Sequence, residues 1–145
     1  MSTESTQERA SYLSHFYQPE VTAYEFMKYF FAYASELTNR IQRDLVDFLY
    51  QQKQLPENTE LMREIHFRNN GVAYYSGNID DALSNLQNGG LLGKENPSFG
   101  TLILKYSPEE VRKIKESIPD KYKETIQNLA TEYYTNMQDM GGALC

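Results

Sequence analysis

Aromatic side chains are concentrated in the segment from residue 21 to residue 33. Seven of these positions carry an aromatic ring or a methionine: Tyr24, Phe26, Met27, Tyr29, Phe30, Phe31 and Tyr33. At 100° per residue, these positions cover nearly the whole circumference of a helix rather than one stripe. Because a helix that is apolar on every side is typical of a buried one, residues 21–33 are predicted to form an enclosed helix.

A second helix is predicted to begin at Asn39, because Asn39 and Gln42 have the spacing of a capping box. The helix is predicted to end at Leu55-Pro56, since proline cannot continue a helix from within. Arg43, Asp44 and Asp47 are expected mainly toward solvent, opposite an apolar stripe of Ile41, Leu45, Phe48 and Leu49.

A turn, a short helix and a hairpin are predicted in the middle of the chain. Asn69-Asn70-Gly71 is a turn signal, and residues 71–75 are predicted to form a short extended segment. Asn78 is expected to cap a helix over residues 78–88, which Gly89-Gly90 ends; its apolar face is Ile79, Ala82, Leu83 and Leu86. Residues 91–93 and 101–106 are β-prone and flank a Pro/Gly loop at residues 94–100, which predicts a hairpin.

Two helices are predicted toward the C-terminal end. Ser107, Pro108 and Glu110 provide the N-cap, the proline at the first helical position and the N3 carboxylate of a capping box. Pro119 ends this helix, and Gly141-Gly142 ends the next one. The apolar stripe of the last helix is Tyr122, Ile126, Leu129, Ala130, Tyr133 and Met137.

The order of these elements predicts a mostly α-helical α+β fold with a winged-helix-like core and a small β-hairpin. The helix over residues 78–88 would take the recognition-helix position, and residues 94–100 would form the tip of the wing. A two-stranded hairpin needs other elements to pack against, and the preceding helices would provide them. We expect one such domain over residues 12–140, with extra N- and C-terminal helices and flexible ends at residues 1–11 and 141–145.

Two stretches of this chain resemble a known family. Residues 38–43, Thr-Asn-Arg-Ile-Gln-Arg, with Leu45, Phe48 and Tyr50, look like the opening helix of Panacea-type domains. Residues 71–76, Gly-Val-Ala-Tyr-Tyr-Ser, and the later residues 90–92 resemble the turn and helix stop of related small winged-helix-like proteins. The resemblance covers residues 37–106, but the spacing after Asn39 differs and Val72 follows Gly71 where the family pattern has proline. Panacea-type domains occur in antitoxins and in regulators linked to phages or mobile elements, so the resemblance implies binding rather than catalysis.

Composition and motifs argue against an enzyme. The chain has only one cysteine, Cys145, and two histidines, His15 and His66, so neither a disulfide nor a multi-ligand metal site is expected. No nucleophile elbow, phosphate-binding loop, H-E-x-x-H or C-x-x-C motif occurs. We expect no catalytic residue, no cofactor and no metal. A small hydrolase would require His66 to lie within hydrogen-bond reach of a carboxylate in a cleft.

No apolar run approaches the roughly 20 residues that span a bilayer, and the N-terminal residues lack a signal-peptide pattern. The 14 basic and 20 acidic side chains give a net charge of −6, which provides no general attraction to anionic membranes or phosphate backbones. We therefore expect a cytoplasmic protein that does not bind membranes.

The predicted helix over residues 78–88 favours a protein partner over DNA. It contains Asp80 and Asp81 but no basic residue, whereas DNA-binding helices place Lys and Arg near phosphates. Basic residues between 105 and 123 alternate with acidic ones, a pattern typical of a solvated surface with ion pairs. We expect a non-enzymatic, acidic regulator, antitoxin-like or a phage-type inhibitor, that binds another protein through Asp80, Asp81, Tyr74 and Tyr75. That partner could be a basic nucleic-acid-binding protein. The alternative is a winged-helix transcriptional regulator that contacts DNA through the wing and residues 112–123.

The composition of the aromatic helix suits a core and an interface equally well. A tyrosine ring can be buried in either setting, as long as its hydroxyl finds a hydrogen-bond partner or stays in contact with water. In one interpretation, its excess apolar surface forms a two-fold dimer through Tyr24, Met27, Phe30 and Phe31. In the other, the last helix covers this surface within one chain. We expect the dimer.

Overall fold

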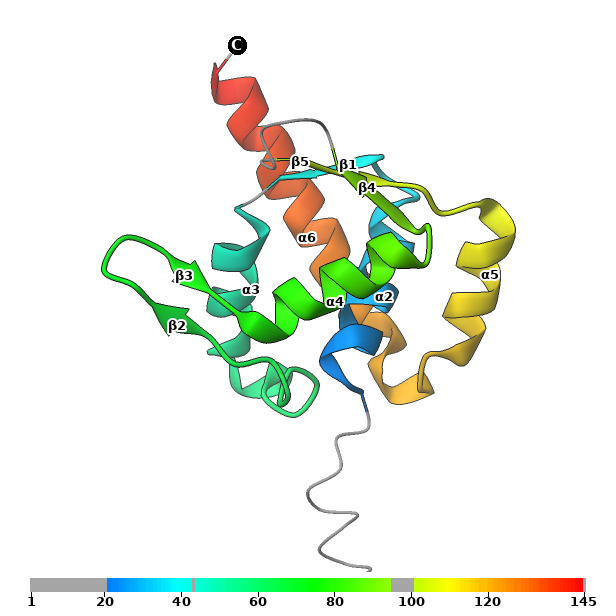
Figure 1. Ribbon diagram of the computed structural model, residues 1–145, viewed down its shortest axis with the longest axis horizontal. Coiled ribbons are helices and arrows are strands. Elements are labelled where there is room, and N and C mark those ends of the chain that lie inside the picture. Colours follow the sequence, from blue (N-terminus) through cyan, green and yellow to red (C-terminus); the bar gives the residue numbers. More distant parts are fainter. Residues whose placement is uncertain (1–20, 43, 95–100, 145) are drawn as a thin grey trace, which may run out of the picture.

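The computed structural model describes residues 21–42, 44–94 and 101–144. Helices dominate this α+β fold, and two small antiparallel sheets complete it (Figure 1). The predicted tail at residues 1–11 and most of the predicted wing tip, residues 95–100, lie outside the described residues. In chain order, the elements are α2 (Ala23–Ala34), β1 (Arg40–Gln42), α3 (Leu45–Lys53), a 3-10 turn (Pro56–Asn58), β2 (Arg68–Asn69), β3 (Tyr74–Tyr75), α4 (Gly77–Asn88), β4 (Leu92–Lys94), β5 (Thr101–Leu104), α5 (Pro108–Ser117) and α6 (Asp120–Leu144).

Helix α2 occupies the centre of the molecule, as the aromatic pattern predicts, and packs against α4, α5 and α6 (Figure 1). Its start is fixed by a capping box between Thr22 and Glu25. The side chain of Glu64 also accepts a hydrogen bond from the Ala23 backbone N–H at 3.2 Å. This second carboxylate satisfies another amide that the first helical turn leaves without a partner.

The predicted dimer interface is wrong for Met27, Phe30 and Phe31, because these side chains are fully buried within one chain. Helices α4, α5 and α6 pack around α2 within the one chain, and the Tyr133 ring of α6 lies edge-on to Phe30, with ring centroids 6.1 Å apart. Of the four predicted interface residues, only Tyr24 keeps substantial exposure, at 36%. The interpretation in which elements of the same chain cover the aromatic helix is therefore confirmed, and the last helix provides part of this cover.

The helix predicted to begin at Asn39 begins instead at Leu45, and residues 40–42 form strand β1. Strand β1 pairs antiparallel with β5, which also pairs with β4, so the sheet order is β1-β5-β4. Ile41 is buried while its neighbours Arg40 and Gln42 are exposed, the alternation of a strand rather than the stripe of a helix. The Asn39–Gln42 capping box therefore does not form, whereas the downstream positions Leu45, Phe48 and Leu49 are buried as predicted.

Helix α4 confirms the helix predicted over residues 78–88, and the pairing of β4 with β5 confirms the predicted hairpin. The residue that caps α4 differs from the prediction. Ser76 is the N-cap and accepts a hydrogen bond from the Ile79 backbone N–H, so Asn78 is not the cap. At the other end, Gly90 adopts a positive φ of 82°, which lets the Leu91 N–H reach the carbonyl of Leu86 at 3.0 Å. Strand β4 then starts at Leu92.

The two C-terminal helices follow the prediction, except at the end of the chain. Ser107 and Glu110 form the capping box of α5, and Pro119 separates α5 from α6. Helix α6 continues to Leu144, through Gly141-Gly142, so these glycines do not end it and residues 141–144 are helical rather than irregular. A glycine weakens a helix by about 1 kcal/mol, but it retains the backbone N–H that the helix needs.

Candidate functional site

The β2–β3 hairpin has a tip that its own asparagine side chains hold in place. Strand β2 pairs antiparallel with β3, with Asn69 opposite Tyr74. The side-chain oxygen of Asn69 accepts a hydrogen bond from the Gly71 N–H at 2.6 Å. The side-chain oxygen of Asn70 accepts hydrogen bonds from the backbone N–H groups of Val72 and Ala73, both at 3.0 Å. Since Gly71 also supplies the required positive φ of 92°, the turn is formed before any partner arrives.

This ordered tip presents apolar side chains to solvent. Val72 is 93% exposed and Tyr75 is 43% exposed. Tyr74 and Tyr75 are consecutive residues of one strand, so their side chains point to opposite faces of the hairpin. Tyr74 is half-buried against α3, and Tyr75 therefore lies on the face turned away from α3. An exposed valine on a preorganised turn has no role in the core.

The hairpin is fixed to the start of α4. The connecting residue Ser76 is buried, and the side-chain oxygen of Asn78 accepts a hydrogen bond from the His66 backbone N–H at 2.9 Å, just before β2. Asp80 and Asp81 lie in the first turns of α4, where both are exposed, and neither forms an ion pair with another described residue. The structure thus places the four predicted partner-binding residues on two directly connected elements.

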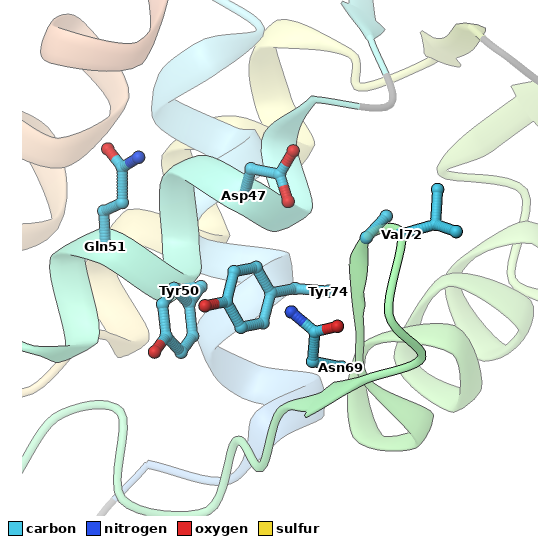
Figure 2. A pocket seen from close by; sticks show the side chains of 7 residues that line it. Asp47, Tyr50, Gln51, Asn69, Val72 and Tyr74 are labelled. Atoms are coloured by element: carbon cyan, nitrogen blue, oxygen red, sulfur yellow. The ribbon is translucent and has the colours of Figure 1, made fainter.

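A pocket of about 370 Å³ lies between α3 and the hairpin (Figure 2). Its wall contains two stacked rings, Tyr50 of α3 and Tyr74 of β3, whose centroids are 3.7 Å apart with an angle of 16° between the planes. The edge of the stack meets Phe67, whose ring centroid is 5.6 Å from that of Tyr50. Asp47 and Val72 also line the pocket. This aromatic cluster holds the hairpin against α3.

Three of these residues are not predicted from the sequence. The helical pattern predicts only that Asp47 faces solvent, and no sequence signal assigns Tyr50 or Val72 to a binding site. The turn signal at Asn69-Asn70-Gly71 is enough to predict that the Val72 side chain is exposed, because a residue at the tip of a hairpin faces solvent. Nothing in the sequence signals that Tyr50 and Tyr74 stack, since they are 24 positions apart and belong to different elements.

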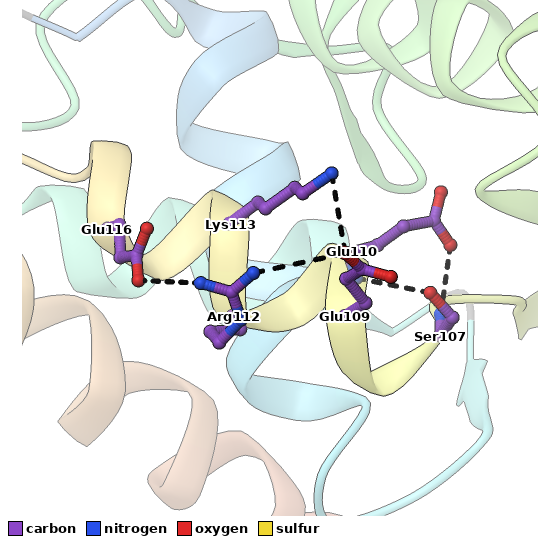
Figure 3. A network of polar contacts seen from close by, with 6 residues as sticks. All are labelled: Ser107, Glu109, Glu110, Arg112, Lys113 and Glu116. Carbon is purple, nitrogen blue, oxygen red and sulfur yellow. Dashed lines mark hydrogen bonds and ion pairs between the residues drawn. The ribbon is translucent and has the colours of Figure 1, made fainter.

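Basic residues on α5 (Figure 3) and at the start of α6 are paired with carboxylates, as the alternating charges predict. Arg112 contacts Glu116 at 3.0 Å and Glu109 at 3.9 Å, and Lys113 contacts Glu109 at 3.6 Å. Three further lysines each pair with an acidic side chain: Lys115 with Glu36, Lys121 with Glu60 and Lys123 with Asp120. These pairs leave little unbalanced positive charge for a phosphate backbone.

Within the described part of the chain, the structure does not place His66 in hydrogen-bond contact with a carboxylate. Glu64, two residues from His66, bonds the start of α2, and the His66 imidazole forms no hydrogen bond or ion pair with a described carboxylate. The described residues also contain no cluster of three or more His, Cys, Asp or Glu side chains that could hold a metal ion.

None of the helices that the structure describes is long and apolar enough to cross a membrane.

Comparisons of the chain with protein-family models, with curated proteins and with solved structures found no significant match.

Proposed function

We propose that this chain is a non-enzymatic, acidic regulator of the cytoplasm that binds another protein, as an antitoxin or a phage-type inhibitor of a host protein does. The observation that carries the proposal is the ordered β2–β3 hairpin, which presents Val72 and Tyr75 beside the acidic start of α4. Interfaces favour such an arrangement, because an apolar anchor on a rigid turn loses little conformational entropy when it binds.

We further propose that the core is winged-helix-like. The order α2-β1-α3-α4-β4-β5 and the sheet order β1-β5-β4 support this assignment, with α4 in the recognition-helix position and β4–β5 as the wing. The β2–β3 hairpin is then an insertion between α3 and α4. In this arrangement the hairpin enlarges the surface around α4, and that surface becomes a protein-binding one.

Electrostatics favour a basic partner, such as a nucleic-acid-binding protein. Asp80 and Asp81 expose two carboxylates on α4, and the chain carries a net charge of −6. Charge complementarity of this kind raises the association rate and selects among partners more than it adds affinity. An acidic helix in a recognition-helix position would occupy the surface on which the partner binds phosphates.

The DNA-binding alternative has less support. Its predicted contacts are the wing and residues 112–123, but Arg112, Lys113, Lys115, Lys121 and Lys123 each lie beside a carboxylate. Helix α4 has no basic side chain to contact a phosphate. Specific DNA binding depends on such contacts to position the protein on the duplex.

Charge reversal on α4 tests the proposal. The double variant Asp80→Lys/Asp81→Lys and the wild-type protein are used to capture partners from the source cell, and bound proteins are identified by mass spectrometry. A control variant, Glu124→Lys/Glu132→Lys, makes the same charge change at exposed positions of α6. We expect a protein that the wild type and the control retain in equal amounts and the α4 variant loses. Equal retention by all three would remove α4 from the binding surface.

The same variants decide between protein and DNA. Fluorescence anisotropy with random duplex DNA at low salt should show no binding by the wild-type chain. If α4 enters a DNA groove, the wild type binds with a steep salt dependence, and Asp80→Lys/Asp81→Lys binds more tightly than the α6 control. That result would replace the protein-binding proposal with the alternative.

A further inference from the structure

Asp47 is the only charged residue among the seven that line the pocket between α3 and the β2–β3 hairpin (Figure 2). Asp47 is exposed and forms no ion pair with another described residue. The amides of Gln51 and Asn69 are the remaining hydrogen-bonding side chains besides the tyrosine hydroxyls. A cation is therefore attracted to this pocket, whereas a phosphate or carboxylate is repelled.

The aromatic wall adds a preference for a flat cation. Tyr50 and Tyr74 stack nearly parallel with centroids 3.7 Å apart, so each ring covers the inner face of the other and a flat group can stack only on an outer face of the pair. Asp47 and Tyr50 are three residues apart on α3, which places the carboxylate and the ring on the same side of the helix. A guanidinium group stacks on aromatic rings and also pairs with a carboxylate through its planar fork; an ammonium group provides only a point charge.

The dimensions fit a side chain rather than a large ligand. The volume of about 370 Å³ is near the lower end of the roughly 300–1,000 Å³ typical of small-molecule pockets. The apolar residues Val72 and Ala73 line the hairpin side, where the methylene stem of a long side chain could pack.

We propose that this pocket binds an arginine side chain of the protein partner, with the guanidinium stacked on an outer face of the Tyr50–Tyr74 pair and paired with Asp47. The inference rests on the proposed protein-binding function and specifies what the hairpin side of that surface recognises. It gives the basic partner a defined anchor beside Val72. A nucleobase could stack on the same rings, but its phosphate would meet the carboxylate of Asp47 rather than a cation.

An NMR titration with short blocked peptides tests the pocket directly. The probe is acetyl-Gly-Arg-Gly-amide, and the control peptide carries citrulline, which has nearly the same shape as arginine but no charge. We expect the arginine peptide to shift resonances of Asp47, Tyr50 and Tyr74 with a dissociation constant of about 1 mM, as suits one side chain. The citrulline peptide should bind at least about fivefold more weakly, because it lacks the charge.

Variants separate recognition from folding. Asp47→Asn should weaken binding of the arginine peptide about fivefold, whereas Glu124→Gln, at an exposed position of α6, should leave it unchanged. Tyr50→Leu should weaken binding, and Tyr50→Phe, which keeps the ring, should restore it; the dispersion of each spectrum reports whether the variant is folded. Equal binding of both peptides, or tighter binding of adenosine monophosphate than of the arginine peptide, would overturn the inference. Loss of protein capture in Asp80→Lys/Asp81→Lys would still support the proposed function in that case.

Discussion

Replacing Tyr133 with phenylalanine removes one hydroxyl that joins three elements. This hydroxyl accepts a hydrogen bond from the Gln42 N–H at 3.1 Å and lies 2.9 Å from the Asp44 carboxylate, to which it can donate. The ring remains in place, because Phe30 and Phe48 hold it with centroids 6.1 and 5.3 Å away. The substitution therefore tests the attachment of α6 to β1 and the start of α3 without creating a cavity.

The expected cost follows from the two hydrogen bonds. A neutral hydrogen bond contributes about 1 kcal/mol, and one to a charged group about 1.5–3 kcal/mol. Because the site is only partly buried, we expect Tyr133→Phe to lower the free energy of unfolding by about 2 kcal/mol. With a slope of about 2 kcal/mol per molar urea, the unfolding midpoint should fall by about 1 M.

Urea unfolding followed by circular dichroism measures this shift. Tyr134→Phe is the matched control, because the Tyr134 hydroxyl makes no hydrogen bond with a described residue; its midpoint should change by less than about 0.3 M. Asp44→Ala should cost less in the Tyr133→Phe background than alone, since the shared bond is already lost. Equal midpoints for the two phenylalanine variants would refute the role assigned to the Tyr133 hydroxyl.

Three further predictions concern the core, the titration of tyrosines and the surface ion pairs. Phe30→Glu should unfold the chain, as measured by loss of helical circular dichroism, because it buries a carboxylate in a fully enclosed site; a folded monomer would contradict this. Burial raises the pKa of Tyr106 and Tyr133 well above the usual value near 10, so above about pH 10 the unfolded state loses protons that the folded state keeps. The contribution of these two tyrosines to stability should therefore be constant below about pH 10 and decrease above it, with tyrosinate absorbance rising sharply as the chain unfolds; complete titration in the folded state would contradict this. Arg112→Ala should change the free energy of unfolding by less than about 0.5 kcal/mol in a urea titration, because both of its ion pairs are exposed; a loss above about 1 kcal/mol would contradict this.

Local signals in the sequence predicted most of the helices. The capping box at Ser107 and Glu110 formed as expected, because its three-residue spacing requires only local contacts. The burial of the aromatic helix followed from its circumference of apolar positions. By contrast, Arg40–Gln42 carried a helix-capping pattern but became a strand. The decisive contacts there come from β5 and from Tyr133, which is 91 positions away from Gln42, and no local pattern contains them.

The candidate site was predictable only in part. Asp80 and Asp81 were identified from their charge on an otherwise uncharged helix, and the structure exposes both. The pocket was not predicted, because it exists only where Tyr50 of α3 meets Tyr74 of β3. The prediction of a dimer interface on α2 was wrong for Met27, Phe30 and Phe31. A hydrophobic pattern indicates how much apolar surface must be buried, but it does not indicate which element buries it. Helices α4, α5 and α6 together provide that cover.

Site-specific photo-crosslinking in the source cell tests the central claim most directly. A benzoylphenylalanine residue replaces Val72 at the hairpin tip or, as the control, the exposed Glu132 on α6. The account predicts a discrete protein adduct from position 72 that is absent from position 132 and disappears when Asp80→Lys/Asp81→Lys is added. Nucleic-acid adducts from position 72, or the same adducts from both positions, would contradict it.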